Sequence, residues 1–151
     1  IKTKIMATTT ATVSISSSDL QPGNRLSINA SSTLMKGGLT TGLTQMQSGV
    51  MSVPLGGPTE HRISPLATEM VGDVHDIASF LYICNKSTDD TYWIDWGIND
   101  LMMGRLYAGD WMFIPWSAAL DADEVEIQAN TGTNDIEYAF FNSDALLPTA
   151  A

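Results

Sequence analysis

Apolar and polar residues alternate most regularly in the second half of the chain. Six segments between residues 80 and 141 show the period of two that is typical of β-strands: FLYICNK, YWIDWGI, GRLYA, WMFIPW, EVEIQA and IEYAFF. Turn-forming sequences such as STDD and NTGTND separate them at a spacing of roughly 8–12 residues, which predicts an antiparallel β-sandwich or barrel. Within EVEIQA, the alternation predicts that Val125 and Ile127 point inward.

The segment WMFIPW is apolar on both of its faces. Trp111 and Phe113 share one face, and Met112, Ile114 and Trp116 share the other. Such a strand lies either between two layers of one domain or in a contact between subunits, and the sequence leaves both interpretations open. The preceding Ala108-Gly109-Asp110 predicts a compact hairpin turn with Gly109 in a left-handed backbone conformation.

The first half of the chain shows weaker strand patterns. ATVSI alternates, and RLSINASSTLMK places Leu26, Ile28 and Leu34 at positions of the same parity. QPGN between these segments is a turn signal, and six glycines within residues 35–58 disfavour a helix. We therefore expect extended segments joined by turns.

Together these patterns predict an all-β protein with an antiparallel β-sandwich or jelly-roll body and an extended N-terminal arm. We place the arm at residues 1–53, a linker at 54–79 and the aromatic-rich body at 80–151. One or two strands from the first half would complete an eight-stranded jelly roll, as one compact domain with the body. The arm either adds strands to a neighbouring subunit or forms a loose edge sheet on its own domain.

Composition divides the chain in the same way. All twelve aromatic residues lie between Phe80 and Phe141, whereas 18 of the first 53 residues are Ser or Thr. Residues 1–75 carry five basic and four acidic residues, and residues 76–151 carry two basic and thirteen acidic ones. The first half has too few large apolar residues to build a core alone, so it must lie on something, pair with something or stay mobile.

The charge and the cysteine content argue against several classes of protein. A net charge of -10 disfavours nucleic-acid binding, which needs a basic surface. The apolar runs are far shorter than the ~20 residues of a membrane-spanning helix, so we expect no membrane partner. The single cysteine, Cys84, allows no intrachain disulfide, and its apolar strand favours a buried, inert thiol.

No arrangement of residues indicates catalysis. His61 and His75 lack the spacing of a metal site, and the acidic loop with Asp121, Asp123, Glu124 and Glu126 lacks the glycine and spacing of a calcium loop. Neither a nucleophile-elbow sequence nor a phosphate-binding loop is present. We therefore predict no enzyme activity, no catalytic or metal-binding residues and no cofactor.

The stretch LYAGDWMFIPW resembles the L-x-x-G-D-x-x-x-I-P segment of cupins, which are jelly rolls. In cupins a metal-binding histidine follows the proline, but here Trp116-Ser117-Ala118-Ala119 follows Pro115, and no H-x-H pair lies upstream. The resemblance therefore supports the turn and the double sheet while weakening the case for a metal-dependent enzyme.

A second resemblance covers about residues 7–142. The order of TATVSISSSDL, LMKGGLTTGLTQ, FLYICNKSTDDTYWIDWGI, GRLYAGDWMFIPWSA, DEVEIQANTGT and IEYAFF is similar to small virion structural proteins of tailed bacteriophages, marine and cyanobacterial ones in particular. The resemblance implies a structural role, with a capsid decoration (cement) protein as the leading expectation. It implies that the protein is made in the host cytoplasm and resides in the virion, at the capsid surface, bound to the major capsid protein and to copies of itself, with a trimer favoured.

The residues expected to make these contacts are the apolar ones of the arm and of the aromatic strands: Leu26, Ile28, Leu34, Trp93, Trp111, Phe113 and Trp116. Three alternatives stay open. They are a tail or fibre component of the virion, a carbohydrate-binding module that uses Trp93 with Asp95, and a degenerate cupin-like enzyme.

Overall fold

The computed structural model describes residues 9–34, 45–55, 62–63, 78–98, 101–117 and 125–142. The regular structure in these ranges is all β-strand and its sheets are antiparallel, as predicted. The strands are β1 (Thr10–Gln21), β2 (Asn24–Thr33), β3 (Gln45–Pro54), β4 (Arg62–Ile63), β5 (Ala78–Asn85), β6 (Trp93–Ile98), β7 (Leu101–Tyr107), β8 (Trp111–Ser117), β9 (Val125–Ala129) and β10 (Thr133–Asn142).

The strands from β3 to β10 pair in a nested order. β3 pairs with β10, β4 with β9, β5 with β8 and β6 with β7, so the chain runs out along one antiparallel ribbon and returns along it. Two more pairings, β5 with β10 and β6 with β9, roll this ribbon into two four-stranded sheets. Their strand orders are β3-β10-β5-β8 and β4-β9-β6-β7.

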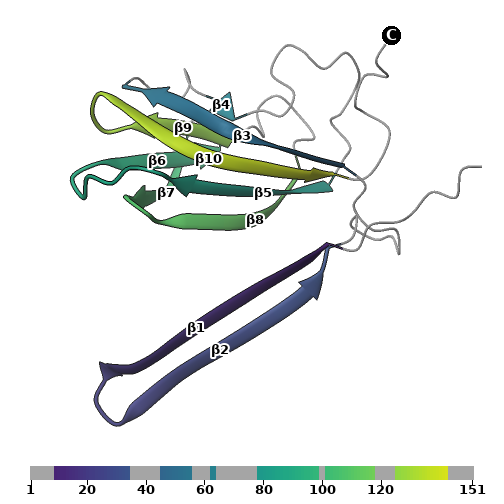
Figure 1. Ribbon diagram of the computed structural model, residues 1–151, viewed down its shortest axis with the longest axis vertical. Coiled ribbons are helices and arrows are strands. Elements are labelled where there is room, and N and C mark those ends of the chain that lie inside the picture. The colour runs from purple at the N-terminus through teal and green to yellow at the C-terminus, as the bar shows by residue number, and fades with distance from the viewer. Residues whose placement is uncertain are drawn as a thin grey trace, which may run out of the picture.

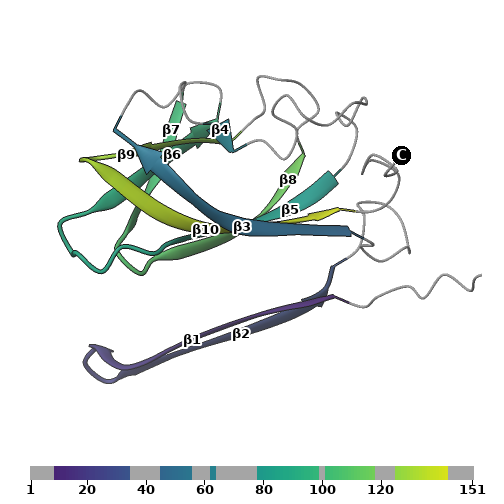
Figure 2. The same ribbon diagram turned by 45° about the horizontal axis from the view of Figure 1, so that its top comes forward.

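The β1–β2 hairpin is a separate two-stranded sheet on one side of this body. Figure 1 shows it beside the sheet that contains β3, β10, β5 and β8, and Figure 2 shows that sheet lying between the hairpin and the other sheet. We call β3-β10-β5-β8 the near sheet and β4-β9-β6-β7 the far sheet.

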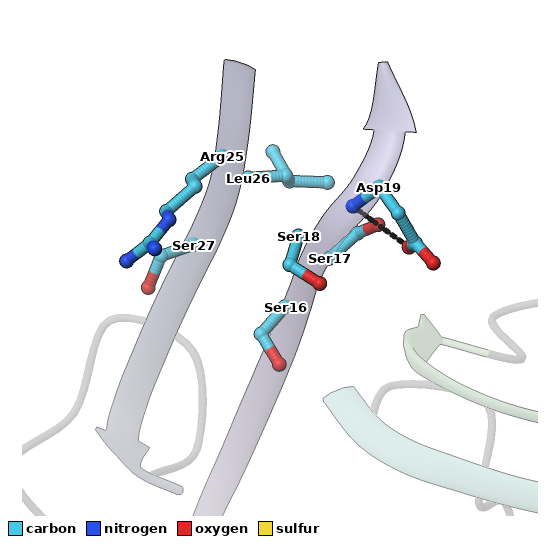
Figure 3. A pocket seen from close by; sticks show the side chains of 7 residues that line it. All are labelled: Ser16, Ser17, Ser18, Asp19, Arg25, Leu26 and Ser27. Atoms are coloured by element: carbon cyan, nitrogen blue, oxygen red, sulfur yellow. Dashed lines mark hydrogen bonds between the residues drawn. The ribbon is translucent and has the colours of Figure 1, made fainter. Parts of the chain in front are cut away.

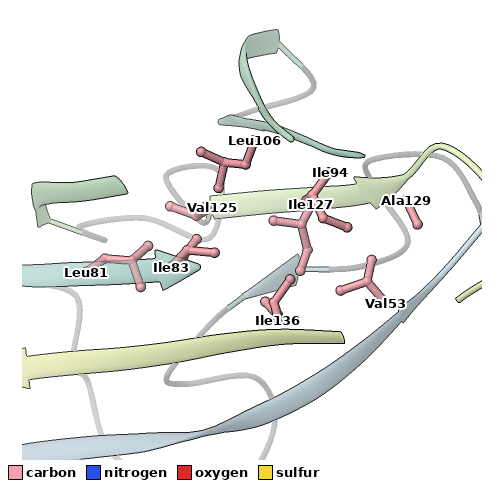
Figure 4. Packing of buried hydrophobic residues seen from close by; sticks show 9 residues of the cluster. All are labelled: Val53, Leu81, Ile83, Ile94, Leu106, Val125, Ile127, Ala129 and Ile136. Atoms are coloured by element: carbon pink, nitrogen blue, oxygen red, sulfur yellow. The ribbon is translucent and has the colours of Figure 1, made fainter. Parts of the chain in front are cut away.

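The facing surfaces of the two sheets share one core of aliphatic side chains (Figure 4). The near sheet contributes Val53, Leu81, Ile83 and Ile136, and the far sheet contributes Ile94, Leu106, Val125, Ile127 and Ala129. The inward orientation predicted for two residues of β9 is thus confirmed. Among the residues whose side chains the structure describes, no aromatic one is fully buried, although Trp96 and Tyr138 pack against the cluster. The buried part of the core is therefore built mainly from branched side chains, which pack well on pleated surfaces.

The first two strands of the two four-stranded sheets, β3 and β4, lie within residues 45–63. β3 pairs with β10 over ten residue pairs and places Val53 in the core. The boundary predicted at residue 53 therefore falls inside a strand of the body, and β4 lies within the segment 54–79 that was assigned to a linker. The predicted strands ATVSI and RLSINASSTLMK instead pair with each other as β1 and β2.

The turn before β8 has the predicted backbone but not the predicted role. Gly109 has a φ of 82°, in the left-handed region, and the Asp110 amide donates to the Tyr107 carbonyl at 2.9 Å. However, β7 pairs with β6 and β8 pairs with β5, so the turn connects the two sheets and closes no hairpin. The hairpin prediction is wrong because a tight turn with Gly at this position suits either connection.

Asn85 ties the two sheets together at this turn. The residue is buried, and its side-chain amide donates to the Leu106 carbonyl at 3.1 Å, which joins β5 to β7. The backbone carbonyl of Asn85 accepts from the backbone amide of Gly109 at 3.0 Å, and the backbone amide of Asn85 donates to the Asp110 carbonyl at 2.9 Å. Such a fully paired buried amide fixes the geometry of the turn.

Truncation of Ile83 tests the core. Ile83→Ala removes a fully buried side chain between the sheets and should lower the free energy of unfolding by about 2–5 kcal/mol, because it leaves a cavity. Val50→Ala, an exposed position in the same sheet, is the matched control and should change it by less than about 0.5 kcal/mol. Urea unfolding followed by circular dichroism measures both, and equal effects would contradict the assignment of the core.

Candidate functional site

The outer surface of the near sheet is aromatic. We define the aromatic face as Phe80, Tyr82, Trp111, Phe113 and Phe141. Phe80 and Phe113 stack with ring centroids 5.6 Å apart, and Phe113 meets Phe141 edge-on at 6.3 Å. Strand pairing aligns Tyr82 with Phe113 across β5 and β8, so these side chains form one continuous surface.

The base of the β1–β2 hairpin covers part of this face. Leu34, just after β2, is only 3% exposed, and its amide donates to the Thr9 carbonyl at 2.8 Å. A cavity of about 220 Å³ remains between the hairpin and the sheet. Residues 9–13 and Leu34 line one side of it, and four residues of the aromatic face (Tyr82, Trp111, Phe113 and Phe141) line the other.

The aromatic face is not fully covered. Trp111 is 53% exposed, which rules out the interpretation of this residue as core. Phe113 is half-buried among the other rings, and Trp116 lies in β8 with its side chain outside the described residues. Of the predicted contact residues, the structure thus brings Leu34, Trp111 and Phe113 together in one place.

The hairpin itself has one apolar and one hydroxyl-rich face. The pairs Val13–Ala30, Ile15–Ile28 and Ser17–Leu26 lie directly opposite each other and project to one side. On the other side, the Thr12 and Ser31 hydroxyls lie 3.2 Å apart, and Ser14 donates to Asn29 at 2.9 Å. Ile15 and Ile28 are 49% and 47% exposed, so the apolar face is largely open to solvent.

The distal part of the hairpin carries a polar hollow, shown in Figure 3. Its volume is about 570 Å³, and its lining comprises Ser16–Asp19 and Arg25–Ser27. Ser17 Oγ accepts from the Leu20 amide at 3.0 Å and donates to Asp19 at 3.3 Å. The serines, Asp19 and Arg25 that line the hollow are hydrogen-bonding groups of the exposed hairpin.

Trp93, the remaining predicted contact residue, lies on the far sheet and is separate from the aromatic face. The Arg105 guanidinium lies 4.4 Å from the centre of its ring. Arg105 also binds Asp95 through both carboxylate oxygens, at 2.6 and 3.2 Å, and these hydrogen bonds raise the pKa of the guanidinium. Because Arg105 occupies the ring and the carboxylate together, the pair offers little to a sugar, and the geometry gives the carbohydrate-binding alternative less support.

The other candidate groups fall mainly outside the described residues. His61, His75, Asp121, Asp123 and Glu124 are among these, whereas Glu126 is buried in β9. Within the described residues, no group of three or more His, Cys, Asp or Glu side chains could hold a metal ion. In the same part of the chain, no helix has the length and apolar character to cross a membrane.

Comparisons of the chain with protein-family models, with curated proteins and with solved structures found no match.

Sequence reasoning missed Phe80, Tyr82 and Phe141 as members of the site. The alternating pattern shows that Phe80, Tyr82 and Cys84 share one face of their strand, but it gives no relation to Trp111 or Phe141 on other strands. The signal that was lacking is which face of β5 points outward, because Leu81 and Ile83 on the opposite face are equally apolar.

Titration of Tyr82 tests the cover over the aromatic face. Burial, followed by the hydrogen bond with the Cys84 side chain, raises the pKa of Tyr82 from 10.0 to about 12. The stability linked to this phenol is therefore fully present below pH 10 and is lost as the pH rises through about 12. The difference in tyrosinate absorbance between the wild type and Tyr82→Phe isolates this group, and a midpoint near 10 would show that the face is open there.

Proposed function

We propose that this chain is a structural protein of a tailed-bacteriophage virion, and specifically a capsid decoration (cement) protein. It is made in the host cytoplasm and resides at the capsid surface, where it contacts the major capsid protein and other copies of itself. Its task is to add adhesive surface to a shell, and it performs no chemical turnover.

The strand order supports a jelly roll for the body. Eight strands that pair first with last, second with seventh, third with sixth and fourth with fifth form a single rolled ribbon, which is the plan of a jelly roll. Viral capsid proteins, lectins and cupins use this fold. The fold therefore agrees with the resemblance to virion proteins, although fold alone does not specify function.

The observation that carries the proposal is the exposed β1–β2 hairpin. Its strands are 12 and 10 residues long, and every residue of β2 is exposed. A two-stranded hairpin is marginally stable in water, and exposed apolar residues along one face of a ribbon are typical of a surface that another protein covers. We interpret the hairpin as the functional part of the N-terminal arm.

A tail or fibre component would use the same features, and the location of the chain in the particle separates the two roles. Antibody labelling or a reconstruction of particles from the virus that encodes the chain should place it on the capsid lattice. Density in the tail would refute the capsid role and support a tail or fibre component, and absence of the chain from purified particles would refute any virion role.

Substitution of Ile28 tests the role of the hairpin in shell binding. Ile28→Glu places a charge on the apolar face and should reduce co-sedimentation with capsid shells that lack the chain by at least about tenfold. Ser27→Glu adds the same charge to the hydroxyl-rich face of the same strand and serves as the control, which should retain binding. Equal binding by wild type and both variants would contradict a role for the apolar face.

A further inference from the structure

The aromatic face and the apolar face of the hairpin are complementary surfaces, and each is only partly buried within one chain. At the hairpin base, Leu34 is buried against the aromatic face, so apolar packing between the two is already established there. Farther along, Ile15 and Ile28 on the hairpin and Trp111 on the sheet are all about half exposed. Figure 2 shows the hairpin and the near sheet as separate layers along the length of the hairpin.

The charges of the two parts favour a contact between copies. Residues 1–44 carry four basic residues and one acidic residue, whereas residues 45–151 carry three basic and sixteen acidic residues. Two bodies repel each other at close range, but the N-terminal part of one copy is attracted to the body of another. Arg25 on β2 belongs to this basic set, and Glu137 and Asp135 on β10 belong to the acidic one.

The length of the hairpin permits such a contact. Its strands are 12 and 10 residues long, and a strand rises about 3.3 Å per residue. The distal half can therefore meet a second copy while Leu34 stays packed on its own body.

We propose that the distal half of the β1–β2 hairpin of one copy docks its apolar face, with Ile15 and Ile28, on the open part of the aromatic face around Trp111 of a second copy. Because each copy has one hairpin and one face, the contact closes reciprocally in a dimer or cyclically in a ring such as a trimer. This contact requires no other protein, so it can be tested on the purified chain apart from the virion role.

The mass of the purified full-length chain in solution is the first test. Light scattering after size-exclusion chromatography should give a closed oligomer for the wild type. Trp111→Ser and Ile15→Glu should each raise the dissociation constant by at least about tenfold, because both remove an apolar contact at the centre of the interface. Met102→Ser, at an exposed apolar position on β7 of the far sheet, is the control and should leave the mass unchanged.

Circular dichroism must show that these variants keep the wild-type fold, which we expect because all three positions are exposed in one chain. A wild type that stays monomeric at high concentration would overturn the proposal. An oligomer that neither Trp111→Ser nor Ile15→Glu weakens would also overturn it.

Cross-linking between distinguishable copies supplies a test of position. Cys84 is the single cysteine and lies opposite Trp111 on β5, at the open part of the aromatic face. A tagged chain with Ile28→Cys and Cys84→Ser is mixed with untagged wild type and treated with a short thiol cross-linker. A tagged–untagged product supports docking between copies, and the same reaction with Ser27→Cys should give much less of it.

Absence of that mixed product, despite an intact thiol on each chain, would overturn the proposal. The outcome is separate from the virion role. Shell binding without self-association would refute the contact between copies and leave the proposed function standing. Self-association without shell binding would refute the proposed function and leave the contact standing.

Discussion

Aliphatic packing between the two sheets determines where the other side chains lie. The inner faces are filled by Val, Leu and Ile from β3, β5, β6, β7, β9 and β10, and sheets that pack through such side chains lie about 10 Å apart. The rings on β5, β8 and β10 that project to the outside of the near sheet therefore meet no partner within the body. An apolar outer surface of this kind is stabilised when another surface covers it, and the hairpin base supplies part of that cover.

The alternating pattern predicted the local structure well, because successive side chains of a strand point to opposite faces and one of these faces packs in the core. All six strands between Phe80 and Phe141 and the left-handed Gly109 are present in the structure. The pattern could not predict which strands pair. Residues 104–116 look like a local hairpin, yet the hydrogen bonds of Asn85 hold the turn between two sheets, and no neighbouring residue signals that distant constraint.

The first half of the chain was predicted less well for a physical reason. β3 contributes Met51 and Val53 to the core region, but serine and glycine interrupt its pattern, and β4 has only two residues, too few to show a period. β1 and β2 were predicted as strands, but their pairing with each other was not. Of the candidate contact residues, Trp93 has Arg105 against its ring, and the alternating pattern does not predict this contact because Arg105 lies twelve residues away on another strand.

The two faces of the hairpin contribute differently to its stability. Its hydroxyl-rich face makes only side-chain hydrogen bonds that water can replace, so these bonds add little net stability. Its apolar face has large side chains along its length, but Leu34, Ala11 and Val13 at the base are the members that the body shields. The base therefore orders the start of the hairpin, and the distal half gains its remaining apolar burial only from another surface. The proposed contact between copies would supply that burial, and the same apolar face is the surface that the proposed role on a shell would use.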